Sequence, residues 1–377
     1  MITENTPLTT KEKIVLSAVA LFSENWYDAI SVAEICRNGG LSNGVFYRYY
    51  KDKEVLFREI LDGFLEVIKD RMSRISGADV EQRLVSFYGY ILESNINDLS
   101  YISIFREGEY RFPEYERRLR EIYVEALRKV FNRTVSAAEY LFIVGSVRFM
   151  LRRPCFDEKI ITADYLKDMV YKGVFECQAE ADFNCLEIDL PPAIDNADEA
   201  DTKTKLILAG KQLIAENSFY KVNIYEITRK AGFAVGTFYI NFKSKEDLFR
   251  EVVKYLGKQL RFYIASNLGE KLSRIEKEIQ GWTLFLKYFE THIQNYQLVR
   301  EAEFVIRDTA REYYNKFETG YLKKSDGIKI EEEAVVANFL IGIAHFLGIE
   351  YFFSKNIIEP RMVIEELSGL ICCGVKQ

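Results

Sequence analysis

The sequence predicts an all-α protein that contains two similar copies of one module in tandem. Three observations support this fold class. The chain matches itself when it is shifted by 192 residues, apolar residues follow helical spacing in both halves, and no sustained period-2 alternation typical of strands occurs. With only 6 prolines and 21 glycines among 377 residues, long helices are easily accommodated.

The internal match is strongest near the start of each copy. Residues 13–60 align without a gap with residues 205–252, and 19 of these 48 pairs are identical, whereas chance would give roughly three. Weaker matches follow, because residues 106–110 resemble 300–304, and Gly145 and Phe149 resemble Gly342 and Phe346. Each copy is therefore about 180 residues long.

Composition and charge exclude several classes of protein. A net charge of −6 excludes a globally basic nucleic-acid binder but permits a local basic surface. Six cysteines without a CxxC pair and two distant histidines provide no zinc site, so we expect no metal, no cofactor and no enzyme. The apolar stretch 334–349 is too short for a membrane span and predicts a buried helix. Because the N-terminus lacks a signal-peptide pattern, we expect a cytoplasmic protein without a membrane partner.

Each copy begins with the pattern of a helix-turn-helix. Capping boxes at Ser31-x-x-Glu34 and Asn223-x-x-Glu226 predict the start of a short second helix. Gly40 and Gly232 then permit the left-handed backbone of a tight turn. A further short helix follows each glycine, and in this motif that helix enters the major groove of DNA.

An acidic segment separates the two copies. Residues 176–201 carry nine acidic side chains and no Lys or Arg, and Pro191-Pro192 lies among them. Charge of one sign together with proline predicts an exposed, extended linker. The expected domains are helix-turn-helix domains at 9–55 and 202–247, helical regulatory cores at 56–178 and 248–377, and the acidic linker at 179–201.

Both copies carry a motif of a dozen residues with fixed spacing. It is Phe46-Tyr47-Arg48-Tyr49-Tyr50-Lys51-Asp52-Lys53-Glu54-Val55-Leu56-Phe57 in copy one and Phe238-Tyr239-Ile240-Asn241-Phe242-Lys243-Ser244-Lys245-Glu246-Asp247-Leu248-Phe249 in copy two. The motif resembles the signature of TetR-type transcriptional regulators, and the resemblance covers both copies. It implies two TetR-like units, each with an N-terminal three-helix DNA-binding domain and a helical ligand-binding and dimerisation domain.

The resemblance also implies roles for single residues. Those expected to face base edges are Asn43, Val45 and Arg48 in copy one and Val235 and Thr237 in copy two. Those expected to hold phosphates are Ser31, Tyr47, Lys53, Tyr239 and Lys245. The pattern adds Ser42 and Asn241 as polar groups available on these helices.

The two recognition helices differ from each other. Val235 and Ile240 replace polar or basic side chains of the family pattern, so contact with thymine methyl groups is expected in copy two. In copy one, Asn38-Gly39-Gly40 stands where the family prefers a helix-forming pair, which predicts a looser recognition helix.

Two copies on one chain predict an intramolecular pseudo-dimer. Helices expected near 137–153 and 164–176 would pack against 332–353 and 361–373 as a four-helix bundle. Two unlike recognition helices then predict an asymmetric operator in double-stranded DNA, read by a monomer.

Aromatic residues in the middle of each copy are candidates for a ligand site. Core packing is the simpler interpretation, and a pocket for a small apolar effector is the functional one. The candidates are Tyr90, Tyr101 and Phe105 in copy one and Trp282, Phe285, Phe289, His292 and Tyr296 in copy two.

We therefore expect a ligand-responsive transcriptional repressor. The alternative is a ligand-binding or protein-interaction module of the same fold that has lost specific DNA binding. Residues 9–60 carry seven basic and seven acidic side chains, which favours the alternative because DNA affinity then depends on charge placement alone.

Overall fold

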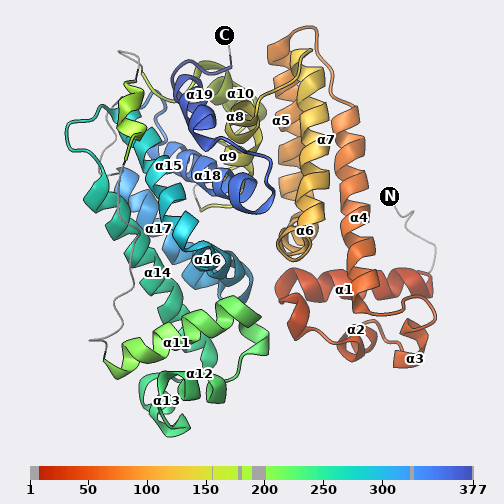
Figure 1. Ribbon diagram of the computed structural model, residues 1–377. Coiled ribbons are helices and arrows are strands. Elements are labelled where there is room, and N and C mark those ends of the chain that lie inside the picture. The colour runs from red at the N-terminus through yellow and green to blue at the C-terminus, as the bar shows by residue number, and fades with distance from the viewer. Residues whose placement is uncertain (1–7, 155, 177–180, 189–200, 323–326, 376–377) are drawn as a thin grey trace. The chain divides into compact units, whose positions relative to one another are not determined.

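The structure is a computed structural model that describes residues 8–154, 156–176, 181–188, 201–322 and 327–375 (Figure 1). Regular structure within these ranges is helical, apart from an isolated bridge between Phe175 and Ile328. The predicted all-α class is confirmed.

The helices of copy one run from residue 10 to residue 172, with η marking 3-10 or π turns. Their bounds are α1 (Thr10–Glu24), η1 (Tyr27–Ala29), α2 (Val32–Asn38), α3 (Asn43–Phe46), α4 (Lys53–Ser73), α5 (Val80–Asn97), α6 (Leu99–Arg111), α7 (Pro113–Phe131), α8 (Ala137–Tyr140), η2 (Leu141–Gly145), α9 (Ser146–Met150) and α10 (Ala163–Lys172).

A short 3-10 helix in the linker, η3 (Phe183–Leu186), precedes copy two. The helices of copy two are α11 (Thr202–Asn217), η4 (Phe219–Lys221), α12 (Ile224–Ala231), α13 (Val235–Asn241), α14 (Lys245–Asn267), α15 (Arg274–Thr291), α16 (Ile293–Val305), α17 (Arg307–Leu322), α18 (Glu333–Gly348), η5 (Ile349–Phe353) and α19 (Pro360–Cys373).

Side-chain caps decide where several helices begin. At Thr9, Ser31, Ser136, Asn223 and Ser273 the side chain accepts the backbone N–H three residues on, and a glutamate at that position reaches back to the cap. These reciprocal bonds satisfy amides that a helix start otherwise leaves without acceptors. The capping boxes predicted at Ser31 and Asn223 are confirmed.

Helices of the two copies pack on each other around two glycines. A Cβ added at Gly145 would lie 2.9 Å from Phe346 Cβ, and one added at Gly342 would lie 2.8 Å from Phe149 Cβ. Each copy thus places a phenylalanine against a glycine of the other copy. This reciprocity is what a two-fold symmetric interface requires. The packing joins α8, η2, α9 and α10 to α18 and α19.

The apolar helix of copy two lies inside this packing. Glu333–Phe353 is long and apolar enough to cross a membrane, yet 89% of its most apolar stretch is buried inside the molecule. Its Asn338 is fully buried, accepts a hydrogen bond from Arg153 Nε at 2.8 Å and donates one to Glu318 Oε2 at 2.8 Å. The segment is a buried core helix, as predicted.

Part of the acidic linker differs from the expected exposed chain. Residues 177–180 and 189–200, including Pro191-Pro192, lie outside the described residues. Between them, Leu186 is buried, Gln280 Nε2 donates to the Cys185 carbonyl at 2.8 Å, and Lys287 Nζ donates to the Ile188 carbonyl. Residues 181–188 therefore dock on α15, because an apolar side chain and two backbone carbonyls find partners there.

The compact units of the structure do not follow the boundary between the copies. One consists of the chain up to residue 76 with residues 89–126, and the other consists of residues 77–88 with 127–377. Helices α8, α9 and α10 of copy one belong to the second unit because they pack on α18 and α19. The domain limits expected from the sequence remain predictions.

The glycine contacts can be tested by Gly342→Ala. The added methyl group would lie 2.8 Å from both Phe149 Cβ and the Ser146 carbonyl oxygen. We expect the free energy of unfolding to fall by about 1–3 kcal/mol, the usual cost of overpacking. Urea denaturation followed by circular dichroism measures it.

Gly63→Ala is the matched control. This helical glycine has no heavy atom within 4 Å of an added Cβ, so we expect a gain of roughly 0.4–1 kcal/mol. Equal effects of the two substitutions would show that the close approach at Gly342 is unimportant.

Candidate DNA-binding surfaces and effector pocket

The turn before each recognition helix depends on a glycine. Gly40 has φ +66° and Gly232 has φ +79°, in the left-handed region that other residues rarely adopt. After the turn, α3 continues for four residues and α13 for seven. Both short helices therefore follow a glycine turn, and α13 is the longer of the two. The looser recognition helix expected of copy one stays a prediction.

The expected base-reading side chains lie on the surface. In copy one Ser42, Asn43 and Arg48 are exposed and Val45 is half-buried. In copy two Val235 is exposed and Thr237 is half-buried. These side chains are at least partly accessible, and their contacts with DNA remain a prediction.

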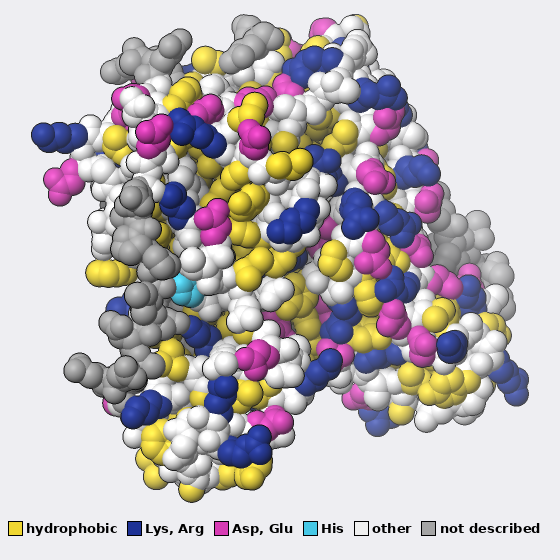
Figure 2. All heavy atoms as spheres, in the orientation of Figure 1, with side chains coloured by type: hydrophobic (Ala, Val, Ile, Leu, Met, Phe, Trp, Pro, Cys, Tyr) yellow, Lys and Arg dark blue, Asp and Glu magenta, His cyan; other side chains and the backbone are white. Residues whose placement is uncertain are grey.

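Copy two carries an apolar recognition surface. Ile240 is 85% exposed, and Tyr239 beside it is 58% exposed. Figure 2 shows hydrophobic side chains gathered at the lower-left tip, where Figure 1 places α13. In copy one the position equivalent to Ile240 is Arg48, with Tyr47 60% exposed beside it. The two recognition surfaces thus share a tyrosine and differ in the next side chain.

Two of the expected phosphate-binding lysines also hold the helix-turn-helix together. Lys53 Nζ donates to the carbonyls of Tyr27 and Ile30, at 2.7 and 2.5 Å. Lys245 Nζ donates to the carbonyls of Phe219 and Val222, both at 2.7 Å. Burial lowers the pKa of both ammonium groups. The same ammonium groups also lie over aromatic rings, 4.0 Å from the ring centre of Tyr27 and 4.3 Å from that of Phe219. The phosphate contacts expected of both lysines stay predictions.

Two further candidates have local partners. Ser31 bonds Glu34 in its capping box, with Oγ donating to Oε2 at 2.7 Å. Asn241 Nδ2 donates to the Thr237 carbonyl at 2.9 Å. By contrast, Ser42 makes no capping hydrogen bond at the start of α3. The side chains of Ser31 and Asn241 therefore already use part of their hydrogen-bonding capacity within the protein. The DNA contacts expected of these two residues stay predictions.

A buried glutamate joins each helix-turn-helix to its helical core, and sequence reasoning missed this role. Glu107 Oε1 of α6 accepts the Tyr27 N–H at 2.8 Å, and Glu301 Oε1 of α16 accepts the Phe219 N–H at 2.8 Å. Burial raises the pKa of Glu107 to about 7, against the lowering effects of the Tyr27 amide and Arg111. The signal was available, because both glutamates lie in the repeated segments 106–110 and 300–304.

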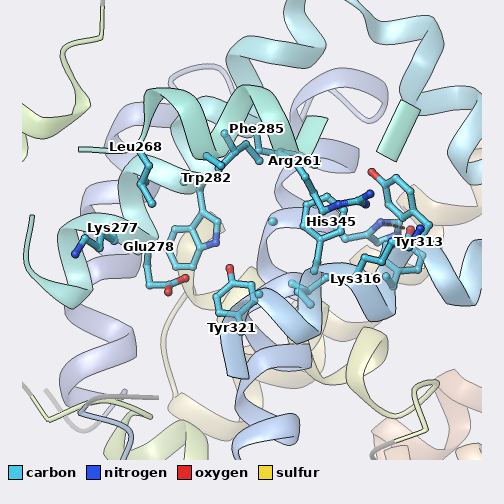
Figure 3. A pocket seen from close by; sticks show the side chains of 18 of the residues that line it. Arg261, Leu268, Lys277, Glu278, Trp282, Phe285, Tyr313, Lys316, Tyr321 and His345 are labelled. Atoms are coloured by element: carbon cyan, nitrogen blue, oxygen red, sulfur yellow. Dashed lines mark hydrogen bonds between the residues drawn. The ribbon is translucent and has the colours of Figure 1, made fainter. Parts of the chain in front are cut away.

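A half-open cavity of about 340 Å³ lies between helices of copy two (Figure 3). Three of the predicted ligand residues, Trp282, Phe285 and Tyr296, line it. Phe289 does not, because its ring stacks behind Tyr296 at 4.7 Å. His292 does not either, because it ends α15 and stacks on Tyr288 at 5.1 Å. The helical spacing of aromatic residues therefore included two residues of α15, Trp282 and Phe285, that line the cavity.

The wall opposite α15 contains a buried polar cluster. Tyr296 Oη donates to the His345 carbonyl and Tyr314 Oη donates to Glu303 Oε1, both at 2.6 Å. The same hydroxyl oxygens lie 3.4 and 3.3 Å from His345 Nδ1. Since both hydroxyl protons are used elsewhere, the geometry favours the tautomer with a proton on Nδ1. His345 was visible as a histidine inside an apolar run, but nothing in the sequence placed it beside Tyr296.

The candidates in copy one show core packing. Phe105 is buried with its ring 5.2 Å from that of Phe64, and Tyr101 stacks on the same ring at 6.4 Å. Tyr90 is half-buried on α5, where its carbonyl accepts from Ser94 Oγ at 3.0 Å. None of these three lines the cavity of copy two, and a ligand role for them stays a prediction.

Comparison with known proteins gives two matches to one family. Residues 14–60 and 206–252 each match the model described as bacterial regulatory proteins, tetR family, which confirms the resemblance and the duplication. The fatty acid metabolism regulator protein of Bacillus subtilis (strain 168) is 28% identical over 130 residues, which cover 34% of this chain and 66% of that protein. The uncharacterized HTH-type transcriptional regulator YerO of the same strain is 29% identical over 65 residues, 17% of this chain and 22% of that protein.

A solved structure of the fatty acid degradation regulator FadR from Bacillus halodurans aligns at 18% identity with a TM-score of 0.40. The alignment covers 48% of this chain and 99% of that one. Among the relatives compared by sequence, the chain spans just under two thirds of the length of the fatty acid metabolism regulator protein and about a fifth of the length of YerO.

The buried glutamate of copy one predicts a pH-dependent stability. The pKa of Glu107 is raised in the folded protein from 4.5 to about 7, so the unfolded chain ionises first as the pH rises. The free energy of unfolding should therefore decrease between pH 4.5 and pH 7. Glu107→Gln keeps an acceptor for Tyr27 and removes this loss, so it should be more stable than the wild type at pH 8, by up to about 3 kcal/mol. Urea denaturation at pH 5 and pH 8 measures the difference, which should shrink at pH 5.

Glu66→Gln on the exposed face of α4 is the control. A stability difference for Glu107→Gln that stays constant with pH, or that Glu66→Gln reproduces, contradicts the role of burial.

Lys53→Gln separates anchoring from phosphate binding. Two carbonyls lose a charged donor, so we expect the free energy of unfolding to fall by about 1.5–3 kcal/mol. If the third N–H also meets a phosphate, the salt dependence of DNA binding should decrease by about one counterion. The exposed Lys51→Gln should change stability by less than about 0.5 kcal/mol. A stability loss as large in Lys51→Gln would refute the anchoring role.

Proposed function

Because the chain belongs to the TetR family of transcriptional regulators and carries two copies of the family's DNA-binding segment, we propose that one chain acts as a complete repressor. Both recognition helices read one operator, and an effector in the cavity of copy two releases it. The observation that carries this proposal is the presence of two exposed, unlike recognition surfaces on a single chain. Because it regulates transcription by binding DNA, the proposed repressor acts in the cytoplasm.

The packing between the copies supports a monomeric repressor. The reciprocal contacts of Gly145 with Phe346 and of Gly342 with Phe149 bury apolar helices of both copies against each other. Arg153 of copy one adds hydrogen bonds to Asn315 and Asn338 of copy two, at 2.6 and 2.8 Å. These contacts use within one chain the kind of surface that separate subunits use to dimerise.

Unlike side chains at one position support an asymmetric operator. Arg48 and Ile240 occupy equivalent places in the two motifs, and both are exposed. Arginine pairs with the O6 and N7 atoms of guanine, whereas an apolar side chain contacts the methyl group of thymine. We infer that the half-site of copy one contains a guanine where that of copy two contains a thymine.

The cavity supports regulation by a small, largely apolar effector. Its volume of about 340 Å³ falls in the range of about 300–1,000 Å³ typical of ligand sites, and most of its wall is apolar or aromatic. The first relative is named for fatty acid metabolism, which is compatible with an apolar ligand.

The alternative is an interaction module of the same fold that no longer recognises a DNA sequence. The exposed apolar side chains of copy two, Tyr225 at 60% and Ile240 at 85%, favour it. Binding to phosphates weakens steeply as salt rises. A chain whose partner binding is independent of salt would fit the alternative.

Operator selection from a random DNA pool tests the proposal. We expect an enriched motif with two unlike half-sites. In Arg48→Ile the guanine preference of one half should be lost, at a cost of about 1–3 kcal/mol for the former operator. In Arg48→Ile with Ile240→Arg the two preferences should exchange, so that the selected motif reverses its orientation.

The wild-type chain at several salt concentrations is the reference, and sedimentation at low concentration gives its mass. A palindromic motif bound by a dimer of chains would overturn the one-chain repressor. No enrichment above non-specific binding would favour the interaction module.

A further inference from the structure

The cavity of copy two presents buried hydrogen-bond donors without acceptors. Arg261 Nη1, Arg274 Nε and Trp282 Nε1 are inaccessible to solvent and have no hydrogen-bond partner among the described residues. All three residues line the cavity, and Trp282 is only 2% exposed. Every one of these atoms is a donor, and leaving a buried donor unpaired is costly. The wall is therefore suited to a molecule that brings acceptors.

Arg261 is the charged member of this set that has no carboxylate partner in the described ranges, because Arg274 is paired with Glu278. A Cβ added at Gly257, one turn earlier in α14, would lie 2.9 Å from Arg261 Nη1 and 2.8 Å from Tyr313 Cδ2. The guanidinium thus lies over a glycine, in space that any other side chain would occupy. Figure 3 shows Arg261, Tyr313 and Lys316 at one end of the cavity. Within the described part of the chain, no carboxylate forms an ion pair with Arg261.

The acidic residue of the lining is already engaged elsewhere. Glu278 Oε1 lies 2.7 Å from Arg274 Nη1, and the hydroxyl of Tyr321 hydrogen-bonds the same carboxyl group. Among the described residues, the lining contains two further cations, Lys277 and Lys316, and no second carboxylate. The cavity therefore has an excess of positive charge on an otherwise apolar wall.

We propose that this cavity binds an anionic amphiphile, with its carboxylate or phosphate group on Arg261 and its apolar body against Phe285 and Ile341. This inference rests on the proposed function and specifies it further, because it states that the mainly apolar effector must also carry a negative charge. A guanidinium pairs with planar or tetrahedral oxyanions through two parallel N–H bonds, and such charge-assisted bonds are about twice as strong as neutral ones. An uncharged or cationic analogue of the same length leaves the half-buried Arg261 without a counter-charge.

Calorimetric titration of the full chain with four ten-carbon probes tests the class of ligand. The probes are decanoate, decyl phosphate, decanol and decylamine, which share an apolar body and differ in the head group. We expect an anionic probe to bind at least tenfold more tightly than decanol, and decylamine to show no binding. The tighter of the two anions identifies the head group. Equal affinities for decanol and both anions, or no binding of either anion, would overturn the proposal.

Three variants test the location of the site. Arg261→Gln should weaken binding of the anion by about tenfold to a hundredfold and leave decanol unchanged. Lys258→Gln removes a cation from an exposed position of the same helix, and its affinity should stay within twofold of the wild type. Gly281 lines the cavity with no heavy atom within 4 Å of an added Cβ, so Gly281→Leu should abolish binding of every probe. Equal effects of Arg261→Gln and Lys258→Gln would contradict a site at Arg261.

Thermal denaturation of each variant checks that it folds. Should Arg261→Gln not fold, the four probes on the wild-type chain still decide the question. Because the titration contains no DNA, its outcome is separate from operator selection. A chain that selects an operator but binds neither anion would refute this inference alone, and a chain that binds an anion but selects no operator would refute the repressor.

Discussion

The close approach of two glycines to two phenylalanines is the contact on which the rest of the molecule depends. With no Cβ at Gly145 and Gly342, α9 and α18 come near enough for Phe346 and Phe149 to pack against the opposite backbone. The contact places helices of both copies in one core. Away from this contact the two copies differ, in the length of their recognition helices and in the side chains exposed there.

The parts that remain alike in the two copies are those that hold backbone atoms. Lys53 and Lys245 each bind two carbonyls of the turn after the first helix, and Glu107 and Glu301 each bind an amide of that turn. Such contacts hold backbone groups of the fold in place, and both copies contain them. At the equivalent exposed positions Arg48 and Ile240, for which we propose contacts with bases, the two copies differ.

Sequence spacing predicted only those residues of the candidate site that lie on a single helix. The helical stripe of aromatic residues in α15 correctly marked Trp282 and Phe285 as cavity residues. It also included Phe289 and His292, which lie beyond the cavity, because spacing identifies the face of a helix and not its neighbours. Arg261 and His345 were missed as pocket residues because they reach the cavity from two other helices, α14 and α18, whose packing on α15 the spacing does not reveal. The buried polar cluster around His345 exists only where α16, α17 and α18 meet.

The sequence by itself determined the all-α class, the duplication, the capped helix starts at Ser31 and Asn223, and the glycine turns at Gly40 and Gly232. These depend on hydrogen bonds and backbone angles within a few residues, so the local pattern is sufficient. Only the tertiary structure decided that residues 181–188 dock on α15, that Lys53 and Lys245 bind carbonyls, and that copy two contains a half-open cavity with an arginine that has no carboxylate partner in the described part of the chain. Each of these depends on which side chains from distant segments exclude water together, and burial of that kind is a property of the packed chain.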